Sequence, residues 1–254
     1  MFHVFVDDNQ INNKNIIIAN NEDAENYNHL KKSVRIKINE LILVSINGFK
    51  QSFDYLTKVI DIDDEKIILD ILEKSKSKEL KYKINLYQGM PKSDKMEFII
   101  EKAVELGVFS IIPVDMDFSI SKFNDKNKSS KILRYNKISK SASEQSKRSI
   151  IPEVRDNMNF SEMIMSIKND RFNILFYENA EGIELTHKFI NDLKNNIVEN
   201  ENINIIIGPE GGFSDKEIEL AKNNNVHILS LGERILRTET AAISSLSIFM
   251  YELE

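Results

Sequence analysis

The chain has 254 residues, of which 41% are hydrophobic, and a formal net charge of −6, which suits one large or two modest domains and argues against general nucleic-acid binding. The sequence has no cysteine and only four scattered histidines, which excludes disulfides, thiolate nucleophiles, cysteine-dependent pyrimidine C5 methylation and a recognisable zinc pattern. It shows neither an apolar run of transmembrane length nor a cationic leader, so we expect a soluble, cytoplasmic protein without a metal.

The first 72 residues are predicted to form a small β-barrel or sandwich. Strand-like runs cover 2–6, 16–18, 41–46, 51–60 and 66–71, with a short helical break over 28–34. Asn47-Gly48, between two of these runs, is the strongest hairpin signal in the chain. Residues 73–81 are charged and rich in serine, which indicates a linker or, alternatively, an exposed strand edge protected by lysines.

From residue 82 the pattern changes to strands that alternate with helices. We expect strands over 84–87, 109–114, 172–177, 204–207 and 226–231, and helices over 93–106, 128–148, 160–167, 185–193, from 214 onward, and over 238–253. This alternation predicts an α/β domain over 82–254 with a mostly parallel sheet covered by helices. The last helix is apolar most of the way round, so we expect it to be buried on two sides.

Glycine is concentrated between Ile205 and Ala242. The run that ends at Ile207 is β-branched and predicts a buried strand, while Ser214 and Glu217 have the spacing of a capping box and predict the start of a helix. A glycine loop between a strand and a helix start offers backbone N–H groups to a ligand, although an ordinary tight turn has the same pattern. Four of the eight glycines fall in this stretch, namely Gly208, Gly211, Gly212 and Gly232.

A second strand in the same stretch ends at Gly232. Residues 233–237 follow as a short charged loop, after which Thr238 is expected to cap the last helix, with Glu239 in its first turn. Two neighbouring strands would then both end in loops able to bind a ligand, where crevices form at the carboxyl ends of parallel strands.

Basic residues gather in three segments despite the negative net charge. The segments are 31–37, 74–83 and 122–148, and the last contains nine basic residues against Asp125 and Glu144. Such clusters keep local RNA binding open, with solvated helix faces and loops as the alternative.

Several motifs together resemble the RsmE family, the 16S rRNA (uracil-N3)-methyltransferases of the SPOUT superfamily. The resemblance covers essentially the whole chain, and agreement in two glycine-containing blocks at this spacing is highly specific. The matching segments are G-P-E-G-G-F-S-x-x-E-I from Gly208, L-G-x-R-I-L-R-T-E-T-A from Leu231, H-L-x-x-x-V-R from His29, K-M-E from Lys95 with E-L-G-V from Glu105, and E-Q-S-x-R from Glu144.

The resemblance implies a fold and a reaction. It implies a PUA-like RNA-binding β-barrel over 1–72, a linker over 73–81 and a SPOUT domain with a trefoil knot over 82–254, which forms a homodimer through the last helix. It also implies transfer of a methyl group from S-adenosyl-L-methionine (SAM) to N3 of a uridine in the decoding region near the 3′ end of 16S rRNA, on the assembled 30S subunit. Many members have arginine near position 3, where this chain has His3.

The resemblance also assigns candidate site residues. Arg237 is expected to orient the uracil or an adjacent phosphate, because a guanidinium can bridge two oxygens. Glu210 or Glu239 could accept the N3 proton, although for Glu239 a role as partner of the helix dipole is favoured, and Arg234 could pair with Glu233 or Glu239. The expected RNA contacts are His29, Arg35, Lys147 and Arg148, and the expected SAM contacts are Glu178, Gly208, Pro209, Glu210, Gly211, Leu231, Gly232, Ile235, Leu236, Arg237, Thr240 and Ala241.

Two other functions stay open from the sequence. The first is a SPOUT methyltransferase that acts on tRNA or large-subunit rRNA, which the glycine loops alone do not distinguish. The second is an inactive RNA-binding assembly factor that kept the fold. A Rossmann dinucleotide binder is disfavoured because G-x-G-x-x-G does not follow the first α/β strand.

Overall fold

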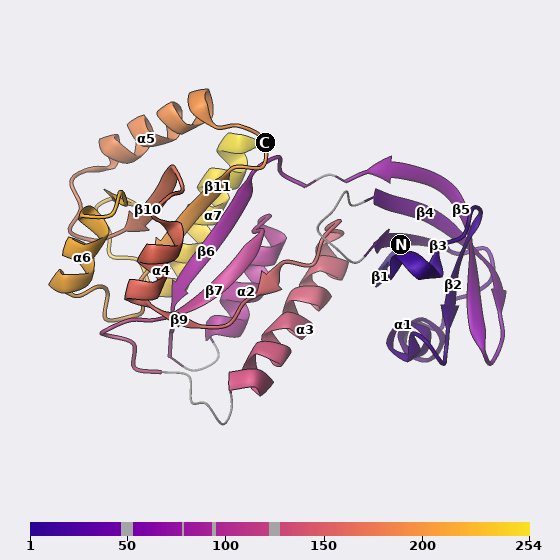
Figure 1. Cartoon of the computed structure of the whole chain (residues 1–254). Coiled ribbons are helices and arrows are strands. Elements are labelled where there is room, and N and C mark those ends of the chain that lie inside the picture. The colour runs from indigo at the N-terminus through magenta and orange to yellow at the C-terminus, as the bar shows by residue number, and fades with distance from the viewer. Residues whose placement is uncertain (47–52, 78, 93–94, 122–127) are drawn as a thin grey trace. The chain divides into compact units, whose positions relative to one another are not determined.

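A computed structural model of the chain describes residues 1–46, 53–77, 79–92, 95–121 and 128–254. The predicted Asn47-Gly48 turn and the predicted helix start at Ser93 lie outside these residues. The chain divides into two compact units (Figure 1). The first unit comprises Met1–Glu79 with Ser143–Ile151, and the second comprises Leu80–Ala142 with Pro152–Glu254.

The first unit is built on a five-stranded sheet in the order β1-β3-β4-β5-β2. β1 and β3 are parallel and the other pairs are antiparallel. In the described residues no pairing of β1 with β2 closes the sheet into a barrel. Its elements are β1 (Phe2–Val6), η1 (Asp8–Gln10), β2 (Asn15–Ala19), α1 (Ala24–Asn28), η2 (His29–Val34), β3 (Leu41–Ile46), β4 (Phe53–Ile62) and β5 (Lys66–Lys76).

The predicted strands of this unit are present, but β5 is longer than expected. It continues to Lys76, inside the segment 73–81 that was expected as a linker. Its last residues pair with β4 alone, since β2 reaches only Asp70. Among the described residues, this part of β5 has no strand on its other edge, and it carries Lys74 and Lys76.

A series of buried hydrogen bonds attaches the segment Ser143–Ile151 to this sheet. The Ser149 hydroxyl donates to Asp54 Oδ2 at 2.7 Å, and the Ser45 hydroxyl donates to Asp54 Oδ1 at 2.6 Å. His3 Nε2 lies 2.9 Å from the same Ser45 oxygen, so it is the donor of that bond. Burial lowers the pKa of His3 by more than the negative charge of Asp54 raises it, so the ring is neutral at pH 7.

The second unit contains a parallel sheet in the order β12-β10-β11-β6-β7-β8, with β9 also paired to β7. Every pairing in it is parallel, as the alternation of strands and helices predicts. The strands are β6 (Lys83–Gly89), β7 (Ser110–Asp115), β8 (Glu153–Val154), β9 (Met158–Asn159), β10 (Phe172–Phe176), β11 (Asn202–Ile207) and β12 (His227–Leu229). The helices are α2 (Lys95–Glu105), α3 (Lys128–Ser146), α4 (Phe160–Ile167), α5 (Ile183–Asn196), α6 (Asp215–Lys222) and α7 (Thr238–Leu253).

Helices cover both faces of this sheet (Figure 1). On one face, Ile205 and Ile207 pack with residues of α2, α3, α5 and α7, whereas on the other face Ile206 packs with α4 and α6. Because both faces are covered, β11 needs apolar side chains at consecutive positions, which explains its run of isoleucines.

A ladder of buried amides fixes the register of the strands at their amino ends. Asn85 Nδ2 donates to Asn204 Oδ1 at 3.0 Å, and Asn204 Nδ2 donates to Asn173 Oδ1 at 2.8 Å. These residues face one another in β6, β11 and β10. A slip by one residue would leave the amides without partners in the core, so the ladder also aligns the loops at the carboxyl ends.

Candidate functional site

The loop after β11 is held in a fixed shape by its glycines and by the start of α6. Ser214 and Glu217 form the predicted capping box, with the Glu217 N–H 3.3 Å from the Ser214 hydroxyl and the Ser214 N–H 2.9 Å from the Glu217 carboxylate. Gly212 has φ +70°, a conformation that side chains rarely allow. A Cβ atom added to Gly211 would lie 2.7 Å from Cβ of Phe118, so this glycine is needed for close packing.

The start of the last helix, after the β12 loop, differs from the prediction. Arg237 is the residue before the first turn of α7, and its side chain makes no capping bond. The prediction that Thr238 caps the helix is therefore wrong. The Thr238 hydroxyl instead donates to the Gly208 carbonyl oxygen at 2.6 Å and accepts from Gln88 Nε2 at 2.9 Å, because it points into the protein beside the loop after β11.

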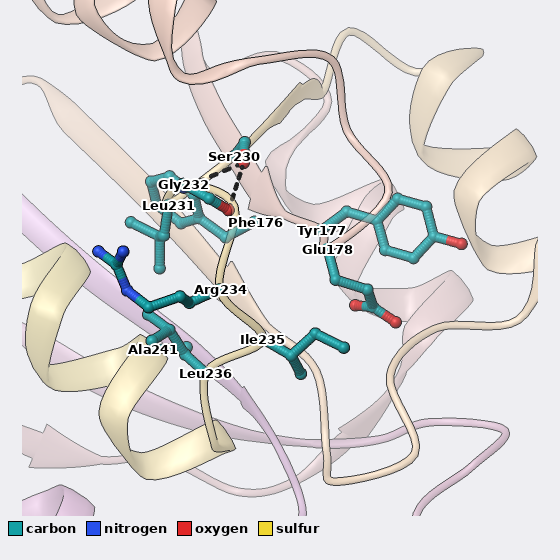
Figure 2. A pocket seen from close by; sticks show the side chains of 10 residues that line it. All are labelled: Phe176, Tyr177, Glu178, Ser230, Leu231, Gly232, Arg234, Ile235, Leu236 and Ala241. Carbon is teal, nitrogen blue, oxygen red and sulfur yellow. Dashed lines mark hydrogen bonds between the residues drawn. The ribbon is translucent and has the colours of Figure 1, made fainter.

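Two adjoining cavities lie where the loops after β10, β11 and β12 meet. The first is an open pocket with about 400 Å³ of empty space, part of which is open solvent, and Figure 2 shows the side chains that line it. The second is likewise open and has about 740 Å³ of empty space. The first is lined by Phe176, Tyr177, Glu178, Ser230, Leu231, Gly232, Arg234, Ile235, Leu236 and Ala241. The second is lined by Phe176, Glu178, Ile207, Gly208, Pro209, Glu210, Gly212, Phe213, Ile235, Leu236, Arg237, Thr238 and Ala241.

The cavities bring together most of the residues that the sequence predicts for a cofactor. Ten of the twelve predicted SAM contacts line one cavity or both, whereas Gly211 and Thr240 lie outside the two linings. The lining residues that the sequence prediction missed include Phe176 and Ser230. Phe176 is the last residue of β10, and Ser230 directly follows β12. The signal was available, because the final residues of neighbouring parallel strands border the same crevice.

The cavities combine apolar walls and glycine backbone with four charged side chains, Glu178, Glu210, Arg234 and Arg237. Figure 2 shows the Glu178 carboxylate and the Arg234 guanidinium pointing away from one another. No ion pair of Arg234 with Glu233 or Glu239 is found among the described residues. Apolar side chains beside glycine-rich backbone suit a small ligand with a flat ring and a polar rim, such as a nucleoside.

Lys95, the first residue of α2, pairs with Glu210 of the second cavity and with Glu239 in the first turn of α7. Its Nζ lies 3.0 Å from Glu210 Oε1 and 3.1 Å from Glu239 Oε2. Partial burial pushes the pKa of Glu210 upward, but donors from its own backbone, Lys95 and the Lys92 N–H outweigh it and lower the pKa. Both candidate proton acceptors are thus engaged by a cation, which favours a structural role for them.

Arg237 differs from these residues. It lines the second cavity with its side chain exposed, and its guanidinium has no hydrogen-bond or ion-pair partner among the described residues. A guanidinium at this position can bind a carbonyl or phosphate oxygen of a substrate.

The four expected RNA contacts all belong to the first unit. His29, Arg35 and Lys147 are exposed. Arg148 is only 8% exposed, and its guanidinium lies against the Glu79 carboxylate, with Nε 2.9 Å from Oε2. The structure therefore favours a structural role for Arg148 over contact with an RNA phosphate.

Within the described residues, no cluster of three or more His, Cys, Asp or Glu side chains is suited to a metal ion. None of the helices in that part of the chain has the length and apolar character needed to cross a membrane.

Comparison with known proteins identifies the family. Residues 78–250 match the model of the RNA methyltransferase domain. A protein of Mesomycoplasma hyopneumoniae named ribosomal RNA small subunit methyltransferase E is 34% identical over 96% of both chains. The Bacillus subtilis protein of that name is 30% identical over 91% of this chain and 89% of its own. The Neisseria gonorrhoeae protein, solved with S-adenosyl methionine bound, superposes with a TM-score of 0.80 at 23% identity over 99% of this chain and 97% of its own. The chain belongs to the RsmE family of RNA methyltransferases.

Proposed function

We propose that this RNA methyltransferase uses SAM to methylate N3 of a uridine in the decoding region near the 3′ end of 16S rRNA, on the assembled 30S subunit. The observation that carries the proposal is the meeting of the loops after β10, β11 and β12 around two adjoining cavities. Family membership supports the reaction type, and the names of the relatives support small-subunit rRNA as the substrate class.

The first cavity is the proposed place for the adenosine of SAM. Leu231, Leu236 and Ala241 supply apolar walls, and the backbone around Gly232 supplies polar groups without bulky side chains. Glu178 lies on both linings and can accept hydrogen bonds from ribose hydroxyls. SAM supplies a methyl group on a positively charged sulfonium, and the chain binds it and aligns it with the uracil.

The second cavity is the proposed place for the methyl-bearing part of SAM and, next to it, the reacting uracil. Methylation breaks the N3–H bond, forms an N3–CH₃ bond and converts the sulfonium to a thioether, so negative charge develops on the uracil oxygens. Arg237 is exposed and unpaired among the described residues, so it can stabilise that charge or hold the adjacent phosphate. Glu210 and Glu239 are proposed to act through Lys95 rather than as proton acceptors, and the proton is released to water.

The first unit is proposed to be a PUA-like RNA-binding barrel. Its exposed basic residues include Arg35 and Lys147, both with a left-handed backbone, and His29 lies on the same unit. These residues can contact phosphates, which fix the register of an RNA without reading its sequence.

The second unit is proposed to be a SPOUT domain with a trefoil knot that acts as a cytoplasmic homodimer. One face of α7 is buried through Ala242, Leu246 and Phe249, whereas Ile248 is 37% and Tyr251 80% exposed. Exposed apolar residues on an otherwise buried helix suit a partner subunit. Light scattering of the protein and of Tyr251→Asp tests this assembly, since a monomeric wild type would contradict it.

A methylation assay tests the proposed substrate. Purified protein and labelled SAM are incubated with 30S subunits, free 16S rRNA, 50S subunits or tRNA, and modified bases are mapped by mass spectrometry. The proposal predicts one N3-methyluridine near the 3′ end of 16S rRNA, formed fastest on 30S subunits. A product on 50S subunits or tRNA would assign another RNA, and SAM binding without any product would indicate an inactive RNA-binding factor.

A further inference from the structure

Lys95 connects two segments that lie far apart in the sequence. Glu210 belongs to the glycine loop after β11, and Glu239 belongs to the first turn of α7. Both carboxylates lie about one hydrogen-bond length from the same ammonium, at 3.0 Å and 3.1 Å. We propose that Lys95 is a positioning residue for methyl transfer, which holds the glycine loop against the start of α7 and so fixes the walls of the SAM pocket.

We call the two ion pairs of Lys95, with Glu210 and with Glu239, the Lys95 clamp. The ion pair with Glu239 is the more sensitive of the two. Glu239 Oε2 is buried, and the Lys95 ammonium at 3.1 Å is the polar contact found for this oxygen within the described part of the chain. Removal of the ammonium would leave a buried charge without compensation, which is costly in a protein interior. The two carboxylates would then also repel each other across the gap between loop and helix.

Glu210 is anchored more firmly. Besides Lys95, it accepts from the Lys92 backbone N–H, with its two oxygens at 3.1 and 3.2 Å from that nitrogen. Hydrogen bonding to Glu210 and Glu239 raises the pKa of Lys95, so its ammonium is charged at neutral pH. Loss of Lys95 would therefore move the start of α7 more than the Glu210 side chain.

The clamp also has a consequence for Arg237, which lies two residues before Glu239. While Lys95 occupies Glu210 and Glu239, these carboxylates are not available to pair with Arg237. Arg237 then keeps its guanidinium for a substrate oxygen. A protein without Lys95 would lose both the geometry of the pocket and the availability of this cation, so both SAM affinity and methylation rate should fall.

The same helix offers a matched control. Lys102 also bridges two carboxylates, Glu101 and Glu105, each at 2.8 Å, but all three residues belong to α2. Lys102→Met therefore removes the same charge and the same kind of double ion pair without joining any loop to α7. Lys95→Met and Lys102→Met differ chiefly in whether the clamp is broken.

The experiment measures SAM affinity by calorimetry and single-turnover methylation of 30S subunits from pH 5.5 to 8.5. Lys95→Met is expected to lose about tenfold or more in rate, since small misplacements of reacting groups are costly, while Lys102→Met stays near wild type. Lys95→Arg should restore most of the loss. Adding Glu239→Gln to Lys95→Met should restore part of it, because the repulsion between the carboxylates is removed. In Lys95→Met, SAM affinity should also rise toward low pH as one carboxylate takes up a proton.

The proposal rests on the assignment of the pocket to SAM, and the two can fail separately. Wild-type protein that does not bind SAM would contradict the proposed function. Wild-type protein that binds SAM, with Lys95→Met equal to it in affinity, rate and pH profile, would overturn the role of Lys95. If Lys95→Met does not fold, the variant Glu239→Gln tests the proposal by itself. It removes one of the two ion pairs and should lower SAM affinity by a smaller factor. An unchanged SAM affinity would overturn the proposed role of Lys95.

Discussion

The Thr238 hydroxyl donates a hydrogen bond of 2.6 Å to the Gly208 carbonyl oxygen and thereby joins the first turn of α7 to the loop after β11. Gln88 at the end of β6 donates to the same hydroxyl at 2.9 Å. One side chain thus links three segments that are far apart in the sequence. Both loops of the proposed SAM pocket depend on it for their relative position.

Replacement of Thr238 by valine should weaken SAM binding. Valine keeps the shape of the side chain but leaves the buried Gly208 carbonyl and Gln88 amide without this partner, at a cost of about 1–3 kcal/mol. We expect a lower melting temperature and a matching loss of SAM affinity in calorimetry. Thr238→Ser keeps the hydroxyl and should stay close to wild type, whereas equal losses in both variants would show that the methyl group matters instead.

Larger side chains in the glycine loop should abolish SAM binding. A Cβ atom at Gly208 would lie 3.0 Å from the Phe213 ring, and at Gly211 it would lie 2.7 Å from the Phe118 Cβ, so valine at either position must displace the loop. Circular dichroism should show that the first unit stays folded. Gly182→Ala is the control, because there the added atom meets only the end of the Glu184 side chain. Unchanged calorimetric affinity in Gly208→Val and Gly211→Val would remove the loop from the SAM site.

Loss of the Arg237 side chain should affect catalysis more than cofactor binding. Arg237→Ala is expected to lower the single-turnover rate by about a hundredfold, a typical loss for one donor to a developing oxyanion, with SAM affinity changed far less. Lys at this position should recover only part of the rate, since an ammonium does not bridge two oxygens. Equal losses of rate and of SAM affinity would reassign Arg237 to the cofactor.

Acidification should destabilise the first unit through His3. Burial lowers the pKa of His3 in the folded protein, with Asp54 and the Ser143 and Glu144 backbone opposing this shift and Lys147 adding to it. The unfolded chain therefore binds the proton more readily, so stability falls as the pH drops below about 6.5 toward the folded pKa. Melting of wild type between pH 8 and 5 should show this loss, and His3→Gln should reduce it. An identical pH dependence in both proteins would exclude His3 as its source.

Local sequence signals predicted most elements of both units. The isoleucine run of β11, the Ser214 capping box and the apolar face of α2 each depend on neighbours within a few residues, so they can be identified in a single sequence. The resemblance to a known family assigned twelve residues to SAM, and ten of them line the cavities.

Contacts between distant segments were not predictable in this way. Thr238 is of a residue type that often caps helices, but its hydroxyl bonds to Gly208 and Gln88, which lie 30 and 150 residues away. Arg148 is of a residue type that often contacts phosphates, yet it pairs with Glu79 inside the first unit. In each case the competing partner becomes visible only when the chain is folded, because nothing in the local sequence indicates which long-range group lies nearby.

The structure of the protein crystallised with SAM tests the central claim most directly. We predict the adenosine between the loops after β10, β11 and β12, against Leu231, Leu236 and Ala241, with its polar atoms bound by main-chain groups and the methyl group directed toward Arg237. Density for SAM at any other place on the chain, or its absence at a saturating concentration of the ligand, would contradict the account.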